Sequence, residues 1–278
     1  MKKLAFAVLG ALVSLSTAGA EEAPKQASGT FESRAWKLEL IGAYAFPADE
    51  VGFDDQPGYK VAVSNRGFVA SWLDKYENRE HYIDNRFRTD EDFVVYFHFD
   101  RQGAYKGMTY YFESGDGCGF CMNGKTTSTV KVEKGRIAGR LTLPKEDDDA
   151  HFDFQFDVPI APTDHGKALP AGGGDPGKVY AAFHKALVDF DTEAVVAHLT
   201  ADNAERFVGD KAKALDLWRS EHPTESYKIV KGWVDGDFAL LLVEGANSFM
   251  KMNLDVLLEK EKGVWKVSDE LTQPKFGD

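Results

Sequence analysis

The two cysteines of the sequence, Cys118 and Cys121, form a Cys-x-x-Cys motif whose thiols could exchange disulfides, bind a metal or close a local disulfide. A thioredoxin-type redox site needs its first cysteine at a helix N-terminus, where the helix dipole lowers the thiol pKa, but glycines flank this pair on both sides and disfavour a helix. A zinc site would need two further ligands at suitable spacing, and the neighbouring sequence offers none. We therefore expect a short disulfide that holds a flexible turn, with redox and metal sites as the alternatives.

A second cluster, Lys145–His151 with the sequence KEDDDAH, offers carboxylates and an imidazole that could hold a metal ion. It lacks the glycine and the alternating ligand spacing of a calcium loop. A run of like charges usually faces water, so we interpret the cluster as a solvated turn between two strands. The sequence also contains no Gly-x-Ser-x-Gly, no phosphate-binding glycine loop and no His-Glu-x-x-His, so we predict neither a metal site nor a cofactor.

The first twenty residues have the features of a secretory signal peptide. Lys2 and Lys3 precede an apolar run from Leu4 to Leu15, and small residues end at Ala20. The run is shorter than the ~20 residues that cross a bilayer, so we expect cleavage after Ala20 rather than membrane insertion. The sequence therefore predicts a periplasmic or secreted protein, a compartment that permits disulfides.

The chain is acidic, with 33 Lys and Arg against 45 Asp and Glu. Without Lys2 and Lys3 the balance is 31 − 45 = −14, which makes nucleic acid and anionic membranes poor partners. With 278 residues and 43% hydrophobic content the chain can form two domains with real cores. We predict a signal peptide (1–20), a β-rich domain (29–160), a Pro/Gly linker (161–174) and a second domain (175–273).

In the first of these domains, hydrophobic and polar residues alternate as in strands with one buried face. Such alternation in Phe93–Phe99, a turn at Asp100–Gly103 and an aromatic stretch at Tyr105–Glu113 predict a β-hairpin. Further strands are predicted at Ala35–Phe46, Tyr59–Ser64, Thr127–Glu133, Arg136–Leu143 and Phe152–Val158. Six or seven short strands indicate a β-sandwich or a barrel.

One stretch of this half departs from the strand pattern. Phe68, Val69, Trp72, Leu73 and Tyr76 lie at helical spacing, and a polar run follows them. We predict one amphipathic helix and then a loop. This stretch could cover a sheet edge as a lid, but an ordinary surface insertion is the default for such composition and is the interpretation we favour.

The second domain should begin with helices. Asp175 is a suitable N-cap and Pro176 suits a first helical position, so a helix is predicted there, and a second short one is predicted after Asp191. A third helix is predicted at Lys211–Arg219. Four strands should follow, at Tyr227–Val234, Asp237–Glu244, Ser248–Leu258 and Val264–Leu271, joined by tight turns such as Asp235-Gly236. Helices followed by an antiparallel meander predict an α+β unit with its helices on one face of a curved sheet.

This order of elements, together with the phrases AFHKALVDFDTEAV and GVWKVSDE, resembles the nuclear transport factor 2-like (NTF2-like, cystatin-like cone) superfamily, in particular small domains of secreted bacterial proteins. The resemblance covers about Asp175 to Gln273 and rests on element order rather than on a catalytic signature; no family is assigned to the N-terminal half. It implies a cone-shaped sheet whose concave face, closed by the first helix, forms a pocket. Members of the superfamily use that pocket for catalysis, for ligand binding or for dimerisation.

Residues of this pocket can be named from the predicted faces. Met250 and Met252 fall on the apolar face of their strand, whereas Asp255 falls on the opposite face and should point to solvent. The predicted ligand pocket consists of Tyr180, Phe183, His184, Trp218, Trp233, Met250, Met252 and Trp265, although the same side chains could serve only as core.

An enzyme of the isomerase or dehydratase type in this superfamily would need a buried base beside an oxyanion donor. His184 and Tyr180, four positions apart on the first helix, are the candidates, and His198 and Glu244 are weaker ones. Hydrogen bonding at the seam between helix and sheet is the structural alternative for Tyr180 and His184. Because no carboxylate falls within the apolar alternation of Ser248–Leu258, we favour a protein that binds a small apolar ligand or a protein partner, with catalysis as the alternative and a homodimer through the C-terminal sheet as one arrangement.

Overall fold

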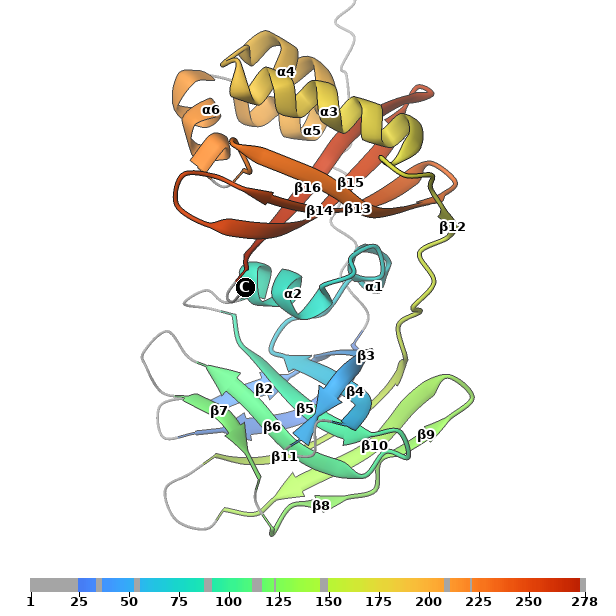
Figure 1. Cartoon of the computed structure of the whole chain (residues 1–278). Coiled ribbons are helices and arrows are strands. Elements are labelled where there is room, and N and C mark those ends of the chain that lie inside the picture. Colours follow the sequence, from blue (N-terminus) through green and yellow to red (C-terminus); the bar gives the residue numbers. More distant parts are fainter. Residues whose placement is uncertain are drawn as a thin grey trace, which may run out of the picture.

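The computed structural model of the chain describes residues 25–33, 37–52, 56–87, 92–111, 117–122, 124–145, 150–207, 211–220 and 222–275. β-strands predominate, and they form three antiparallel sheets. The predicted signal peptide and residues 146–149 of the acidic cluster lie outside the described residues. From bottom to top, Figure 1 shows two sheets, the helices α1 and α2, a third sheet and a layer of helices.

The first two sheets form a sandwich. One sheet has the order β2-β1-β11-β10-β8, with β9 paired to β10, and the other has the order β3-β4-β5-β6-β7. The strands of the first sheet are β1 (Ala27–Glu32), β2 (Lys37–Leu40), β8 (Thr127–Ser128), β9 (Lys131–Glu133), β10 (Arg136–Leu143) and β11 (His151–Pro159). Those of the second are β3 (Gly42–Val51), β4 (Gln56–Ser64), β5 (Val94–Asp100), β6 (Tyr105–Tyr111) and β7 (Gly117–Cys121).

Aromatic side chains fill the space between these two sheets. Phe152, Phe154 and Phe156 alternate inward along β11, as their spacing predicts, and Phe97 of the facing sheet packs against the first two at ring-centroid distances of 5.2 and 4.7 Å. Burying such rings in edge-to-face and tilted contacts stabilises the sandwich beyond the area they remove from water.

The segment between β4 and β5 forms the middle layer. It folds as two short helices, α1 (Ala70–Leu73) and α2 (Arg79–Phe87), rather than as the predicted single helix and loop. Leu73 and Ile83 pack on the sandwich, against the outward face of the second sheet, whereas Tyr76 packs on the third sheet with Leu257. The segment is therefore neither an edge lid nor an ordinary surface insertion, because it lies between two sheets and packs on both (Figure 1).

The third sheet, here called the C-terminal sheet, has the order β12-β13-β14-β15-β16. Its strands are β12 (Lys167–Ala168), β13 (Ser226–Asp235), β14 (Phe238–Ala246), β15 (Lys251–Glu261) and β16 (Val264–Pro274), and β12 lies within the predicted linker. Its helix-covered face packs against α3 (Gly174–Val188), α4 (Thr192–His198), α5 (Ala201–Ala204), the 3-10 turn η2 (Glu205–Phe207) and α6 (Lys211–Ser220). The opposite face, here called the outer face, packs against Tyr76, which lies between α1 and α2, and against Tyr82 of α2.

The helix starts follow the sequence only in part. Asp191 caps α4 as predicted, because its carboxylate accepts the backbone N–H of Ala194 at 3.0 Å. Helix α3 instead begins one residue before Asp175, with Gly173 as its N-cap in the left-handed conformation at φ 80°. The predicted N-cap at Asp175 was therefore wrong, because glycine reaches that conformation without the strain a side chain would meet.

Asp255 corrects the sequence prediction most clearly. It lies on the outer face as expected, but it is only 8% exposed, and its carboxylate accepts the backbone N–H groups of Glu77 and Asn78, each at 2.9 Å. The segment between α1 and α2 covers it and keeps it from solvent. Burial raises the pKa of Asp255, and the two backbone hydrogen bonds oppose that rise.

Candidate functional site

Two β-bulges decide which side chains reach the helix-covered face of the C-terminal sheet. On β16, Val267 pairs with Leu258 and Asp269 pairs with Leu257, so Ser268 is an extra residue in that strand. On β13, Val230 is the extra residue between Ile229 and Lys231. Because alternation has a period of two, each extra residue moves the side chains that follow it to the other face.

The bulge on β16 places Glu270 on the helix-covered face. Continuing the alternation of Trp265 and Val267 would put Asp269 on that face and Glu270 on the outer one. The bulge reverses this arrangement, so Glu270 stands opposite Val256, a core residue of the helix-covered side. The carboxylate of Glu270, which regular alternation would place on the outer face, thus lies in the interior, and its side chain is only 3% exposed.

Glu270 belongs to a buried polar cluster with Trp218 and His222. The indole Nε1–H of Trp218 donates to Oε2 of Glu270 at 2.8 Å, and Nε2 of His222 contacts the same oxygen. The imidazole Nδ1 faces the carbonyl oxygen of Trp218. His222 is 2% exposed, and Phe183 packs edge-on against the rings of both Trp218 and His222.

The ring nitrogens of His222 have two different kinds of partner. A carbonyl oxygen can only accept, so Nδ1 carries a hydrogen and donates it to Trp218. Nε2 contacts Oε2 of Glu270 and also lies 2.9 Å from the indole Nε1 of Trp218, whose single N–H is directed at both atoms. An imidazole in contact with a carboxyl group is a pairing that general acid–base catalysis uses.

The cluster borders a cavity of about 650 Å³ between α6, the C-terminal end of α2 and the strands β15 and β16. We call it the inner cavity. Its lining is mixed: Phe207, Trp218, Met250 and Met252 form an apolar part beside the buried His222–Glu270 pair, and Asn85, Arg86, Asp269 and Thr272 form a polar part. This combination is typical of small-molecule sites, in which apolar surface supplies affinity and a few polar atoms fix orientation.

Two buried polar atoms near this cluster have no hydrogen-bond partner among the described residues. They are Oε1 of Glu270 and the hydroxyl of Tyr180, a residue with 0% of its surface exposed. Burial raises the pKa of Tyr180 far above its usual value, and the charge of Glu270 raises it further. An orphaned acceptor and an orphaned donor are costly in a core, and a polar ligand could satisfy either one.

The predicted catalytic pair does not form a dyad. The rings of Tyr180 and His184 lie 6.3 Å apart, and His184 donates from Nε2 to the Pro223 carbonyl oxygen at 2.5 Å. Burial lowers the pKa of His184, while that carbonyl acts in the opposite direction. His184 therefore has the helix–sheet seam position that the structural alternative describes, whereas Tyr180 points a hydroxyl into the core without a partner in the described chain.

The other predicted pocket residues divide between the two faces. Phe183, Trp218, Met252 and Trp265 belong to or pack against the core of the helix-covered side, and Met250 stands at the rim of the inner cavity, 42% exposed. Trp233 does not join them: it packs on the outer face with Leu240, 5.4 Å from the ring of His165. The bulge at Val230 is the cause, since it shifts every later residue of β13 by one face.

The remaining candidates from the sequence also have defined positions. Glu244 forms an ion pair with Lys275 at 3.2 Å and is half exposed, and the pKa of His198 is lowered by partial burial. Cys118 and Cys121 are joined in a disulfide, as predicted, but they lie in β7 beside β6 rather than in a flexible turn. Among the described residues no group of three or more His, Cys, Asp or Glu side chains is arranged to hold a metal ion.

Comparison of the chain with family models, with curated proteins and with solved structures found no match. Within the described ranges, no helix is long and apolar enough to cross a membrane.

Proposed function

We propose that this protein binds a small, mainly apolar molecule in the inner cavity, with a polar group of that molecule held at Glu270. The observation that carries the proposal is the buried carboxyl group beside the apolar part of the cavity, with one oxygen contacted by Trp218 and His222 and the other unpartnered among the described residues. A ligand hydroxyl or amide N–H that donates to Oε1 would supply the missing hydrogen bond.

We further propose that the C-terminal region is an NTF2-like domain in a periplasmic or secreted protein. The helices on one face of a four-stranded antiparallel meander support the first part, and the disulfide and the leader-like N-terminal sequence support the second. A homodimer through the outer face is not proposed, because Tyr76 and Tyr82 of the middle layer pack on that face.

Native mass spectrometry of the protein purified from an oxidising compartment tests the binding proposal. We expect a mass excess that is lost on denaturation, and Met250→Trp, which narrows the rim of the inner cavity, should reduce its occupancy. Phe249→Trp is the matched control, because Phe249 is 85% exposed and does not line the cavity. Equal occupancy in the two variants would place the ligand elsewhere, and a bare protein would remove the proposal.

Acid–base catalysis in the same cavity is the second candidate, and the His222–Glu270 pair favours it because an imidazole contacts a carboxyl group at the cavity wall. Incubation of the captured molecule with the protein separates the two candidates. Catalysis predicts a new species with the native sequence, seen as a changed mass or, for an isomer of equal mass, as a changed chromatographic retention, and an unchanged molecule with Glu270→Gln. Binding alone predicts an unchanged molecule with both. In the catalytic case His184→Ala should retain turnover, since its ring is held at the Pro223 carbonyl.

A further inference from the structure

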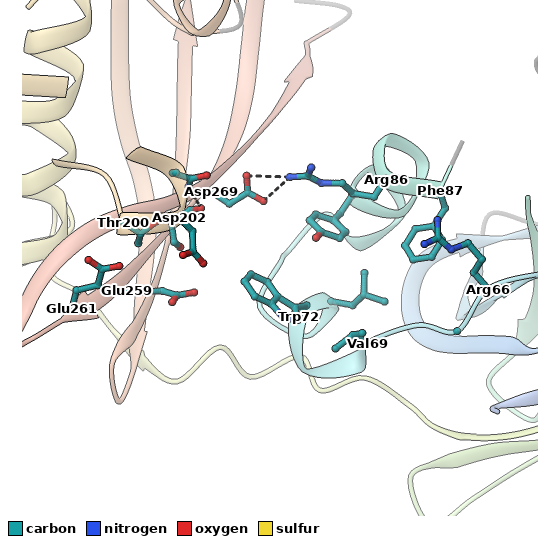
Figure 2. A pocket seen from close by; sticks show the side chains of 15 residues that line it. Arg66, Val69, Trp72, Arg86, Phe87, Thr200, Asp202, Glu259, Glu261 and Asp269 are labelled. Atoms are coloured by element: carbon teal, nitrogen blue, oxygen red, sulfur yellow. Dashed lines mark hydrogen bonds and ion pairs between the residues drawn. The ribbon is translucent and has the colours of Figure 1, made fainter. Parts of the chain in front are cut away.

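A second cavity, of about 560 Å³, lies between the sandwich half and the C-terminal half of the molecule, and we call it the crevice. Its N-terminal wall comes from α1 and α2 and the residues before them, and its C-terminal wall comes from α5, β15 and β16 (Figure 2). Junctions between domains are common places for ligand sites, because two separately formed surfaces meet there. The crevice is separate from the inner cavity, although Arg86 and Asp269 border both.

The charges that line the crevice are unequal. Four carboxylates contribute to it, from Asp202, Glu259, Glu261 and Asp269, against two guanidinium groups. Both guanidinium groups already face carboxylates: Arg86 pairs with Asp269 at 3.2 Å, and Arg66 pairs with Asp92, outside the lining, at 2.6 Å. No cation of the lining is therefore left over for an anionic ligand.

The carboxylates have fewer ion-pair and hydrogen-bond partners than the guanidinium groups. Among the described residues, Asp202 has no ion-pair or hydrogen-bond partner, and the side chain of Glu261 accepts only the backbone N–H of Ala201, at 2.9 Å. The carboxylate of Glu259 forms an ion pair with the ammonium group of Lys75 at 3.4 Å. The C-terminal wall thus presents a negative charge that the chain itself does not neutralise.

The opposite wall is aromatic and incompletely packed. Trp72 is 44% exposed and Val69 is 47% exposed, although both border the crevice. The ammonium of Lys75 lies 4.3 Å from the centroid of the Trp72 ring, so this indole already stabilises one organic cation. Figure 2 shows Trp72 on the side facing Glu259 and Asp202.

A polar atom in the lining adds an independent indication of a ligand. The hydroxyl of Ser268, the extra residue of the β16 bulge, is buried and has no hydrogen-bond partner in the part of the chain that the structure describes. Bulges are frequent beside ligand sites, where they redirect a side chain. An N–H of a ligand would satisfy this hydroxyl.

We propose that the crevice binds an organic cation, a primary ammonium or guanidinium group on an apolar stem. Its head group faces Trp72 and the carboxylates of Asp202 and Glu261, and the stem covers the exposed surface of Val69. The same chemistry is carried by a lysine or arginine side chain of a peptide and by a free polyamine. This proposal does not depend on the function proposed for the inner cavity.

Isothermal titration calorimetry of the whole chain with pentylammonium, and with 1-pentanol as its uncharged counterpart, tests the proposal. We expect one site for the cation, binding at least about tenfold weaker for the alcohol, and weakening of cation binding as salt rises from about 50 to about 500 mM. Equal binding of the alcohol, or no binding of the cation at millimolar concentration, would overturn it.

Variants locate the site. Asp202→Asn with Glu261→Gln removes two charges while the Gln oxygen can still accept the Ala201 N–H, and it should weaken cation binding about tenfold. Glu193→Gln with Glu225→Gln removes the same number of negative charges, from exposed positions outside the crevice, and should leave binding unchanged. Equal weakening in both double variants would reduce the effect to net charge and contradict the proposal.

The source of the cation is decided by two further probes, an acetylated and amidated Ala-Lys-Ala peptide and spermidine. Tighter binding of the peptide assigns the crevice to a protein or peptide partner, and tighter binding of spermidine assigns it to a free polyamine. With either result, Trp72→Ala should weaken binding of the tighter probe. Unchanged binding would show that Trp72 is not part of the site.

Discussion

The carboxylate of Asp255 accepts the backbone N–H of Asn78 across a sequence separation of 177 residues. The oxygen that does so also accepts the N–H of Glu77, two residues before α2 begins. A strand of the C-terminal sheet therefore satisfies the backbone of a segment inserted in the sandwich half. Tyr76 reinforces this junction, because its hydroxyl donates to Asp269 at 2.5 Å.

We predict that Asp255→Asn is neutral or stabilising at pH 7, whereas Asp255→Leu costs about 2–4 kcal/mol. The Asn oxygen can still accept both N–H groups without a buried charge, but Leu leaves both donors unsatisfied. Because burial raises the folded-state pKa of Asp255, its contribution to stability is present below the unfolded pKa and is lost as pH rises through the folded value. Urea unfolding between pH 4 and pH 8 should show this slope in the native sequence and less of it in Asp255→Asn; the same slope in both would refute the assignment.

A second pH dependence should come from His98 in the sandwich. Burial, assisted by the charge of Lys60, lowers its pKa from 6.5 to about 4. The unfolded chain therefore takes up a proton first, so stability is present above pH 6.5 and falls by up to about 3 kcal/mol as pH decreases toward 4. Proton NMR titration of the imidazole should find it neutral at pH 5.5, and an ordinary pKa in the folded state would exclude this effect.

The shared middle layer predicts that the two halves unfold together. Leu257 is 3% exposed and packs with Tyr76, so Leu257→Ala should cost about 2–5 kcal/mol. Because the middle layer packs on the sandwich through Leu73 and Ile83 and on the C-terminal sheet through Tyr76 and Tyr82, calorimetry should show one transition that moves as a whole to lower temperature. Val264→Ala, which truncates a side chain that is 56% exposed, is the control and should change little. Two separate transitions in the native sequence would indicate that the halves are independent.

The His222–Glu270 pair should show strong coupling. Replacing either residue alone by Leu leaves its partner buried without its counterpart, at a cost of about 3–5 kcal/mol. The double replacement removes both polar groups, so its cost should fall short of the sum by about 2 kcal/mol or more. Denaturant unfolding of the four proteins measures this difference, and simple additivity would show that the contact contributes no coupling.

Regular alternation made most strands predictable. The four strands of the C-terminal meander lie close to their predicted bounds, and Phe152, Phe154 and Phe156 face the core as their spacing indicates. The sequence prediction gave the wrong exposure where a segment distant in sequence packs on a strand. Asp255 is buried because a segment far away in sequence covers it, and no local pattern near β15 records that contact.

The candidate site was less predictable for a local reason. Glu270 was overlooked and Trp233 was assigned to the pocket, and in both strands a bulge separates the misplaced residue from the residues whose pattern is regular. A bulge adds one residue without changing the composition that is typical of a strand. Assigning every second residue to the same face therefore gives the wrong face for the residues after the bulge. The buried histidine of the pair, His222, follows α6 in a stretch without periodicity and gave no signal.

The extra residue in β16 also affects how relatives of this chain should be aligned. Here the inward carboxylate follows the inward valine at the third position, as Val267 and Glu270. In a homologous strand without the bulge, the equivalent carboxylate would stand at the second position after the valine. An alignment without a gap between these two residues would therefore match Glu270 to an outward-facing side chain, and the site would look unconserved where it is in fact retained.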